Sequence, residues 1–372
     1  MTALPFLRAA CCGLVFVSAL LLAQQNEEVL FDSQAGTLVG SKFGPIATFQ
    51  RALSVELGKC GKPTVIADGK LGTKTQKAIV DFQRCRIGTD DKLLSKHGEL
   101  TVGLWRAVLP TESLPNVVER SFVLWLSHEG TDYDDMEWNF GTADEASGLT
   151  WGPYGATVGY GNEVRGILAK IEREQPGLIE KVFANESSVV KQLIMRRADD
   201  GYSILKPVFD NRSRRAEWPE MFRQLGEHKE VREAYDWYAF QSPDWLQPPL
   251  RKLYGLLNDP PKPTEVDFAF FVDIAMHMSL SEARISKTRD AIAATEREHA
   301  LSSGERRRVI SRALVPTHQV EDRLGRNVVY YVDAIGADNL STEEKNAWSV
   351  RSAMRASQCG LLDREFLPDF VK

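Results

Sequence analysis

Residues 127–161, with the sequence SHEGTDYDDMEWNFGTADEASGLTWGPYGATVGYG, join a group of acidic side chains to a glycine-rich aromatic run. Paired carboxyl groups cleave glycosidic bonds, one as proton donor and the other as base or nucleophile. The stretch therefore holds the chain's candidates for acid–base chemistry. Its carboxylates are Glu129, Asp132, Asp134, Asp135, Glu137, Asp144 and Glu145.

Glu129 differs from the other acidic residues because it continues an apolar helical stripe. Val118, Phe122 and Trp125 share one face of a predicted helix. Glu129 is the next position on that face, and Gly130 is a natural helix terminator. Burial and the negative end of the helix dipole would both favour a protonated carboxyl group. Glu129 is thus a candidate proton donor, although a solvent-facing residue at a helix end fits the same pattern.

A β-hairpin is predicted in the second half of the stretch. Residues 149–151 and 156–160 have strand character, and residues 152–155 have turn chemistry. The hairpin brings Thr150 and Thr157 near each other across the two strands. Aromatic rings in and around it are candidates for stacking on sugars, and each is also a candidate core residue: Trp138, Trp151, Tyr154, Tyr160 and Trp237.

The elements that must position these residues follow a predicted export signal. Arg8 precedes an apolar run at 9–23, which is too short for a comfortable membrane span and typical of a signal peptide ending at Ala23. Cleavage there predicts a periplasmic or secreted chain without a stable membrane span, and an uncleaved anchor is the alternative. In an oxidising compartment Cys60 and Cys85 can form a disulfide, which leaves Cys359 unpaired.

Residues 44–110 form the first predicted domain, with three helices. Apolar residues at helical spacing mark the first helix from Ile46 to Leu57, and a turn at Asp68 and Gly69 precedes the second helix. Thr73 is the expected N-cap of the second helix. The third helix is expected at residues 101–108.

The segments IATFQRAL, ADGKLGTKTQKAIVDFQ and GELTVGLWRAVL of this region resemble the peptidoglycan-binding domain found beside many bacterial cell-wall hydrolases. That family is a three-helix module with the signature D-G-x-x-G-x-x-T-x-x-A-[IV]-x-x-F-Q. The resemblance implies a glycan or stem-peptide ligand, although each signature residue also suits a turn, a cap or a core. The signature residues here are Asp68, Gly69, Gly72, Thr75, Ala78, Ile79, Phe82 and Gln83.

Residues 117–372 follow a proline-bearing linker and form the second predicted domain, which is mostly helical. The run from Phe268 to Leu280 is apolar on nearly all sides, which is typical of a central helix. Asp273 within it must be hydrogen-bonded or neutral. Asp273 is therefore expected as a buried structural partner or as a substrate-binding residue.

Glu129-Gly130, followed by a hairpin that ends in residues 157–161 (TVGYG), resembles the lysozyme superfamily of phage-type lysozymes and chitosanases. The run 272–278 is similar to the central helix of these enzymes. The resemblance implies that Glu129 is the general acid and that Thr157 helps to place the attacking water or to shape the subsite. The candidate substrate-binding residues are Trp151, Tyr154, Tyr160 and Asp273. The spacing from Glu129 to Thr157 is longer than in that family, so the second carboxylate stays open among Asp132, Asp134, Asp135 and Asp144, with Asp135 and Asp144 preferred.

Other functional classes find little support in the composition. A net charge of −5 without a long basic run disfavours nucleic-acid binding, and Arg306-Arg307-Arg308 is expected on a helix surface. The six histidines are scattered without an HxxxH pair, so no zinc site is expected. The DYDD segment lacks the residue order of a calcium loop. No metal or other cofactor is predicted.

Together these patterns predict a mainly α protein, with a small three-helix binding module and a lysozyme-like α domain that contains a short β-hairpin. The expected activity is that of a muramidase, which hydrolyses the glycan strand between N-acetylmuramic acid and N-acetylglucosamine. The expected partner is peptidoglycan, and the expected state is a monomer. A non-catalytic wall-binding protein with a degenerate lysozyme-like domain, a chitosanase and a lytic transglycosylase are the alternatives.

Overall fold

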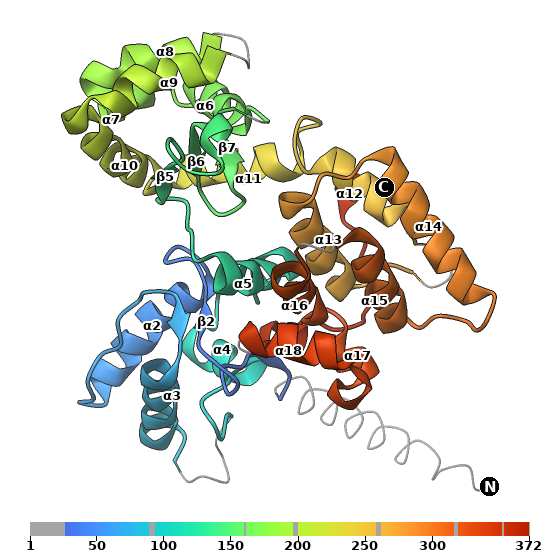
Figure 1. The fold of residues 1–372 in the computed structure, drawn as a ribbon. Coiled ribbons are helices and arrows are strands. Elements are labelled where there is room, and N and C mark those ends of the chain that lie inside the picture. Colours follow the sequence, from blue (N-terminus) through green and yellow to red (C-terminus); the bar gives the residue numbers. More distant parts are fainter. Residues whose placement is uncertain are drawn as a thin grey trace, which may run out of the picture. The chain divides into compact units, whose positions relative to one another are not determined.

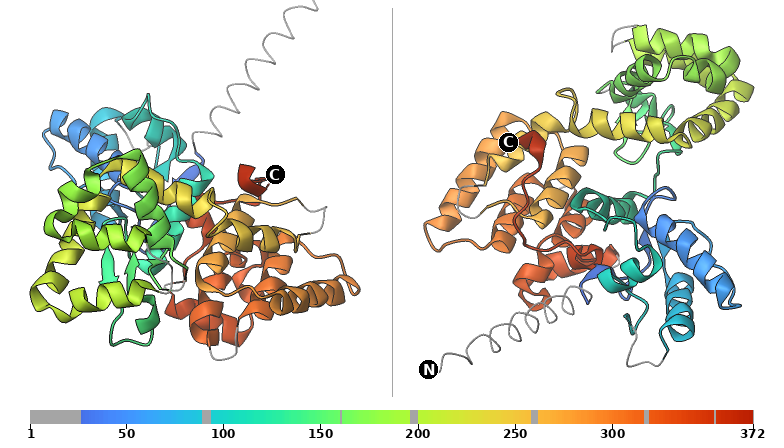
Figure 2. Two further views of the ribbon diagram at one scale, coloured as in Figure 1. Left: turned by 90° about the horizontal axis from the view of Figure 1, so that it is seen from above. Right: turned by 180° about the vertical axis from the view of Figure 1, so that it is seen from behind.

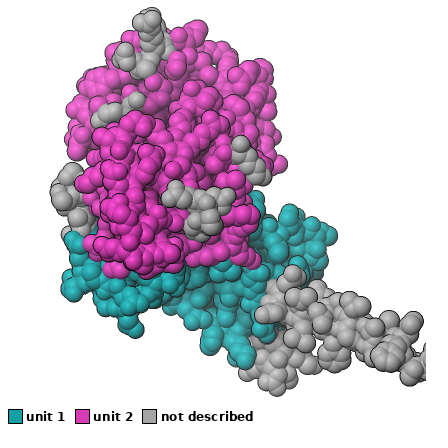
Figure 3. All heavy atoms as spheres, turned by 90° about the vertical axis from the view of Figure 1, so that its right-hand side faces the viewer, with its two compact units in different colours: residues 1–128, 319–362 teal, residues 129–318, 363–372 magenta. Residues whose placement is uncertain are grey.

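The computed structural model describes residues 27–88, 94–159, 161–195, 200–257, 262–315, 319–351 and 353–371. This part of the chain is mainly helical with small antiparallel sheets, as the sequence predicts. It forms two compact units, Met1–His128 with Gln319–Leu362 and Glu129–His318 with Asp363–Lys372, which Figure 3 colours separately. The predicted domains at 44–110 and 117–372 have different bounds from these units, and the predicted signal peptide at 1–23 lies outside the described residues.

The first unit contains the expected three-helix module and a later helical segment (Figure 1). None of the helices in the described ranges has the length and apolarity that a membrane-spanning segment needs. The elements of this unit are β1 (Val29–Phe31), β2 (Leu38–Val39), α2 (Pro45–Lys59), β3 (Lys70–Leu71), α3 (Thr73–Arg86), β4 (Leu100–Thr101), α4 (Val102–Val108), α5 (Val117–Glu129, whose last residue falls in the second unit), η6 (Val320–Leu324), α16 (Gly325–Val328), α17 (Val332–Ile335), η7 (Ala337–Asn339), α18 (Thr342–Val350) and η8 (Ala356–Cys359).

The core of the three-helix module follows the predicted stripe of α2. Ile46, Phe49, Leu53 and Leu57 are fully buried. The third helix, α4, begins after Thr101, whose hydroxyl oxygen accepts a hydrogen bond from the Leu104 backbone N–H at 3.2 Å. Apolar periodicity and capping chemistry therefore account for these helices.

The N-cap of α3 is Gly72 rather than the predicted Thr73, which is the first helical residue. The close approach of β2 explains the glycine, because a Cβ atom at Gly72 would lie 2.8 Å from Thr37 Oγ1. Gly72 therefore starts the helix without a side-chain cap.

The predicted disulfide is confirmed, because Cys60 and Cys85 are bonded to each other near the C-terminal ends of α2 and α3. Cys359 is buried and free. Burial raises the pKa of the Cys359 thiol well above its ordinary value. Since the thiolate is the reactive form, Cys359 is an inert core residue.

The later segment of the first unit has its own small core and returns to β1. The core residues are Leu324, Val328, Tyr331, Val332, Leu340 and Ala347. The Asp32 backbone N–H donates to the Gln358 carbonyl at 2.7 Å, and Gln358 Nε2 donates to the Asp32 carbonyl at 3.2 Å. The buried Arg120 guanidinium also donates to the Gly360 carbonyl. Hydrogen bonds between residues far apart in the sequence thus join the beginning and the end of this unit.

The second unit contains a three-stranded antiparallel sheet, β5-β6-β7, which lies beside α6 and α10 (Figures 1 and 2). In every view of the ribbon, α14 and α15 run alongside each other as a helical hairpin (Figure 2). The elements are β5 (Met136–Trp138), η2 (Glu145–Ser147), β6 (Leu149–Trp151), β7 (Ala156–Thr157), α6 (Glu163–Glu174), α7 (Leu178–Phe183), η3 (Ala184–Glu186), α8 (Ser187–Met195), α9 (Gly201–Asp210), α10 (Arg212–Gly226), α11 (Lys229–Phe240), α12 (Gln247–Tyr254), α13 (Glu265–His277), α14 (Glu282–Glu296), α15 (Ser303–Leu314) and η9 (Asp369–Val371).

Helix α13 is the predicted central helix, and all of its residues from Glu265 to Ile274 are buried. Its N-terminus carries a capping box in which Thr264 and Asp267 bond each other's backbone N–H groups. The apolar run from Phe268 is therefore enclosed on all sides, as its composition predicts.

The arginines of α15 correct an expectation from the sequence, because Arg306 and Arg307 are buried rather than on a helix surface. Arg307 Nη1 lies 3.0 Å from Asp267 Oδ1 and 2.8 Å from Asp363 Oδ1. A guanidinium can be buried when carboxylates neutralise it. The partner Asp363 belongs to the C-terminal segment, which the sequence did not connect with α15.

Candidate functional site

Glu129 is the last residue of α5, as the helix pattern predicts. Phe122 and Trp125 on the same face are 7% and 0% exposed, but the Glu129 side chain keeps 30% of its surface exposed. The expectation that Glu129 continues a buried stripe is therefore wrong, because the buried residues of α5 end at Leu126, one turn before the helix itself ends. A half-exposed carboxyl group remains accessible to a substrate.

Two residues of α13 stand beside Glu129. His277 Nε2 lies 2.9 Å from Glu129 Oε1, an ion-pair distance, although the N–H direction does not make a hydrogen bond with the carboxylate. The same Nε2 atom is 3.7 Å from Asp273 Oδ1, one helical turn earlier. Asp273 is 2% exposed. The imidazole therefore stands between a buried and an accessible carboxylate.

The predicted hairpin forms with the expected register. Thr150 pairs with Thr157, and Trp151 pairs with Ala156. The sequence did not predict β5, which adds a third strand and pairs Glu137 with Thr150. Side chains directly opposite each other in a sheet lie on the same face. Glu137, Thr150 and Thr157 therefore form one row across the sheet, on the face where alternate residues are exposed or half-buried.

Glu137 is the carboxylate that the sequence interpretation missed. The sequence signal for this strand was the alternation of apolar and polar residues at 136–138. Glu137 stands there between an apolar and an aromatic residue, as Thr150 does in β6. The Thr157 hydroxyl in the same row donates to Glu163 Oε2 at 3.0 Å, and the Thr157 backbone N–H donates to the same oxygen at 3.0 Å. Glu163 thus holds the Thr157 side chain in place.

The two preferred candidates for the second carboxylate lie outside this row. Asp135 Oδ2 accepts the Asp132 backbone N–H at 2.7 Å and so closes the turn before β5. Asp144 is exposed and is the N-cap of the short helix η2. Neither carboxylate belongs to the row that contains Thr157, whereas Glu137 does.

The aromatic residues of the hairpin lie in the core of the second unit. Trp151 is 0% and Tyr154 is 4% exposed, and the Trp151 indole N–H donates to the Tyr133 carbonyl at 2.7 Å. This burial favours structural roles, so their substrate-binding roles stay predictions. Tyr160 lies outside the described residues. Trp237 keeps 37% exposure, with Lys170 Nζ 4.0 Å from its ring centroid.

Asp236 on α11 is a further unusual carboxylate that the sequence interpretation missed. Burial raises its pKa to about 7, against hydrogen bonds from Tyr133 and Tyr154 that lower it. The Tyr133 hydroxyl donates to Asp236 Oδ1 at 2.6 Å. The neighbouring Tyr235 hydroxyl donates to the Trp151 carbonyl at 2.8 Å. Asp236 therefore supports the buried side of the hairpin rather than the face that carries Thr157.

In the three-helix module, the residues of the family signature converge on one buried amide. Gln50 Nε2 donates to Asp68 Oδ1 at 3.1 Å, to the Lys70 carbonyl at 3.0 Å and to Thr75 Oγ1 at 3.0 Å. Gln50 Oε1 accepts the Gly69 backbone N–H at 2.9 Å. Gln50 is fully buried. The signature thus holds the loop before α3 in shape.

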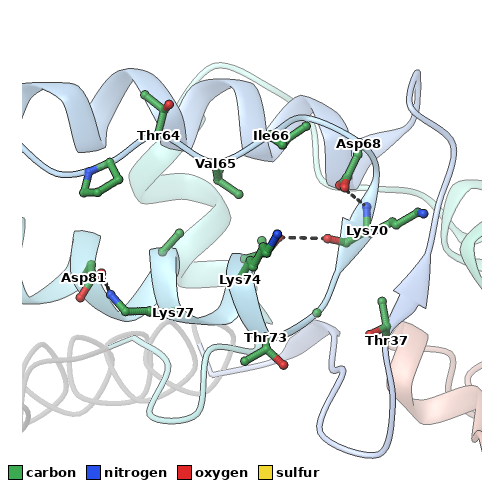
Figure 4. Close-up of a pocket in the computed structure, with 14 residues that line it drawn as sticks. Thr37, Thr64, Val65, Ile66, Asp68, Lys70, Thr73, Lys74, Lys77 and Asp81 are labelled. Carbon is green, nitrogen blue, oxygen red and sulfur yellow. Dashed lines mark hydrogen bonds and ion pairs between the residues drawn. The ribbon is translucent and has the colours of Figure 1, made fainter.

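That loop and α3 enclose a hollow of about 570 Å³ (Figure 4). Figure 4 shows the side chain of the loop residue Val65 pointing toward α3, which carries Lys74 and Lys77. It is lined by Thr37, Pro63, Thr64, Val65, Ile66, Asp68, Lys70, Gly72, Thr73, Lys74, Thr75, Lys77, Ala78 and Asp81.

Within the described ranges, no group of three or more His, Cys, Asp or Glu residues could hold a metal ion. No family model matches the chain. Comparisons with curated proteins and with solved structures found no match either. Any conclusion about function therefore rests on the residues of the candidate site.

Proposed function

We propose that the chain is an exported peptidoglycan hydrolase that cleaves glycan strands as a muramidase. One observation carries the proposal. An accessible carboxyl group lies at the end of a helix, and a short turn in the sequence leads from it to a sheet whose exposed face carries a second carboxylate and two threonines. Glu129 is the first carboxyl group and Glu137 is the second. Glycoside hydrolysis requires two such groups with different tasks.

In the proposed reaction, Glu129 donates its proton to the glycosidic oxygen while the bond to the anomeric carbon breaks. Glu137 supplies the second carboxylate, either as base toward water in an inverting reaction or as nucleophile in a retaining one. Thr157, held by Glu163, orients the attacking water with its hydroxyl oxygen. The anomeric configuration of the product distinguishes the two routes.

His277 and Asp273 act in this proposal as supports for the proton donor. The imidazole lies 2.9 Å from Glu129 Oε1, and Asp273 anchors the same end of α13 within the core. A carboxyl group with fewer accessible orientations is better preorganised for proton transfer. His277 is therefore a positioning residue and not a second acid.

The three-helix module is proposed to hold the enzyme on the cell wall, and a hollow on its surface is large enough for part of a muropeptide. The disulfide between Cys60 and Cys85 supports an exported protein, because such bonds persist in oxidising compartments. Anchoring raises the effective concentration of glycan near the catalytic residues.

The test is digestion of purified peptidoglycan by the full mature chain, with products identified by mass spectrometry. The wild type should release fragments with new reducing ends. Glu129→Gln and Glu137→Gln should each lower the rate at least about 100-fold, which is the scale of lost acid or base catalysis. Asp144→Asn is the matched control and should stay within about twofold, because Asp144 is exposed outside the row.

The possible outcomes separate the alternatives. Wall binding without any product from the wild type would overturn the hydrolase and favour a non-catalytic wall protein. Anhydro products would identify a lytic transglycosylase. Full activity in Glu129→Gln would remove Glu129 as the acid, and a large loss in Asp144→Asn with none in Glu137→Gln would return the second role to the acidic loop. Thermal melting of each variant checks that it is folded.

A further inference from the structure

The hollow of the three-helix module continues into a second one beside it. The larger hollow, of about 570 Å³, and its neighbour, of about 500 Å³, share Thr37, Gly72 and Thr73. The second hollow is lined mainly by neutral polar residues such as Gln34 and Gln76. Charge therefore concentrates in the larger hollow.

The larger hollow has a surplus of positive charge. Lys77 Nζ is bonded to Asp81 Oδ2 at 2.6 Å, so these two charges compensate each other (Figure 4). Asp68 Oδ1 accepts hydrogen bonds from Gln50 and from the Lys70 backbone N–H. Across the described part of the chain, no carboxylate forms an ion pair with the ammonium groups of Lys70 or Lys74. Asp68 keeps its negative charge, because both of its donors are neutral, so the three lysines and two aspartates of the lining leave a net charge of +1 for an anionic ligand.

The walls of the same hollow carry aliphatic groups and no aromatic ring. Ile66 is 73% exposed and leaves an aliphatic side chain open to contact with a ligand. Val65 and Ala78 extend this apolar surface. Small methyl groups fit such a wall, whereas the flat face of a sugar ring is usually bound by an aromatic side chain. The lining therefore favours a peptide over a glycan.

We propose that this hollow binds the peptide stems of peptidoglycan through their free carboxylates, with Lys70 and Lys74 as the recognition pair. Peptide stems combine alanine methyl groups with carboxylates, so they match both the aliphatic wall and the surplus charge. The inference rests on the proposed role of the module in wall binding and names the part of the polymer that it reads. Lys70 and Lys74 lie outside the hydrogen-bond network of Gln50, except through the Lys70 backbone.

The experiment measures binding of a dye-labelled tetrapeptide stem to the full mature chain by fluorescence anisotropy. Lys70→Gln and Lys74→Gln should each weaken binding about two- to fivefold, the range of an exposed ion pair, and the double variant should weaken it further. Lys77→Gln is the matched control, because its ammonium lines the same hollow but is already paired with Asp81. Rising salt should weaken binding to the wild type more than to the double variant.

Two competitors decide the ligand chemistry. The same tetrapeptide with amidated carboxyl groups should compete poorly, and glycan strands without peptide should not compete. Equal competition by the amidated peptide, or equal binding by the double variant, would overturn the proposal. Stronger competition by bare glycan would also overturn it. Because a peptide stem contains no glycosidic bond, the result is independent of the proposed hydrolysis, which can fail while this binding succeeds.

Discussion

Removal of the disulfide is expected to loosen the three-helix module selectively. Cys60 and Cys85 are 25 residues apart. A closed loop of this length lowers the entropy of the unfolded chain enough to stabilise the folded state by about 3.5 kcal/mol. Cys60→Ser combined with Cys85→Ser should therefore raise the open population of the module about 300-fold, since each 1.4 kcal/mol is a factor of ten.

Hydrogen exchange with mass-spectrometric detection measures this change element by element. Peptides from α2 and α3 should lose protection in the double variant, and peptides from α13 should not, because α13 belongs to the other compact unit. Reduction of the wild type should reproduce the effect, since Cys359 is buried with no bond to lose. A loss of protection below about tenfold in α2 and α3 would refute the loop-entropy reasoning.

Three further predictions concern the second unit. The pKa of Asp236 in the folded protein, about 7, lies above its ordinary value, so the contribution of Asp236 to stability decreases as the pH rises from about 4 to 7. Between about pH 5 and pH 8, the thermal midpoint of the wild type should therefore fall more than that of Asp236→Asn. Gly152 has φ +74°, and a Cβ there would lie 2.7 Å from the Tyr235 ring; Gly152→Ala should lower the free energy of unfolding in urea by about 2 kcal/mol or more. Arg307→Met leaves Asp267 buried without its cation, and should cost about 3–5 kcal/mol in the same assay.

Matched variants isolate each cause. Gly155 has φ +67° but only a 4.0 Å contact for a Cβ, so Gly155→Ala should show the backbone cost alone. Arg223 pairs with Glu220 on the surface, and Arg223→Met should cost less than about 1 kcal/mol. A pH profile unchanged by Asp236→Asn would contradict the Asp236 assignment. If Gly152→Ala and Gly155→Ala lower the free energy of unfolding equally, the contact with Tyr235 does not contribute to the cost.

Local patterns predicted the elements whose cause is local. The register of Thr150 with Thr157 followed from alternation and turn residues, and α2 followed from helical spacing. The N-cap of α3 was missed because Gly72 is favoured by the approach of Thr37, the residue that precedes β2. Short-range chemistry in the sequence does not reveal such a contact.

The parts of the candidate site that depend on long-range pairing were not predicted. Glu137 became visible only when β5 paired with β6, because a three-residue strand has too little alternation to stand out. His277 lies about 150 residues from Glu129 in the sequence, so nothing local links them. Arg307 looked like a surface residue because Asp363, its partner, comes from the C-terminal segment.

The course of the chain limits how this protein can be divided or recombined. The backbone passes between the two units three times, after His128, His318 and Leu362. No single cut in the gene therefore yields either unit whole. A fragment that ends at 318 keeps both proposed catalytic carboxyl groups but removes the carboxylate of Asp363 from Arg307. The three-helix module itself lies before the first of these crossings, so only the later helical segment makes the first unit discontinuous in the sequence.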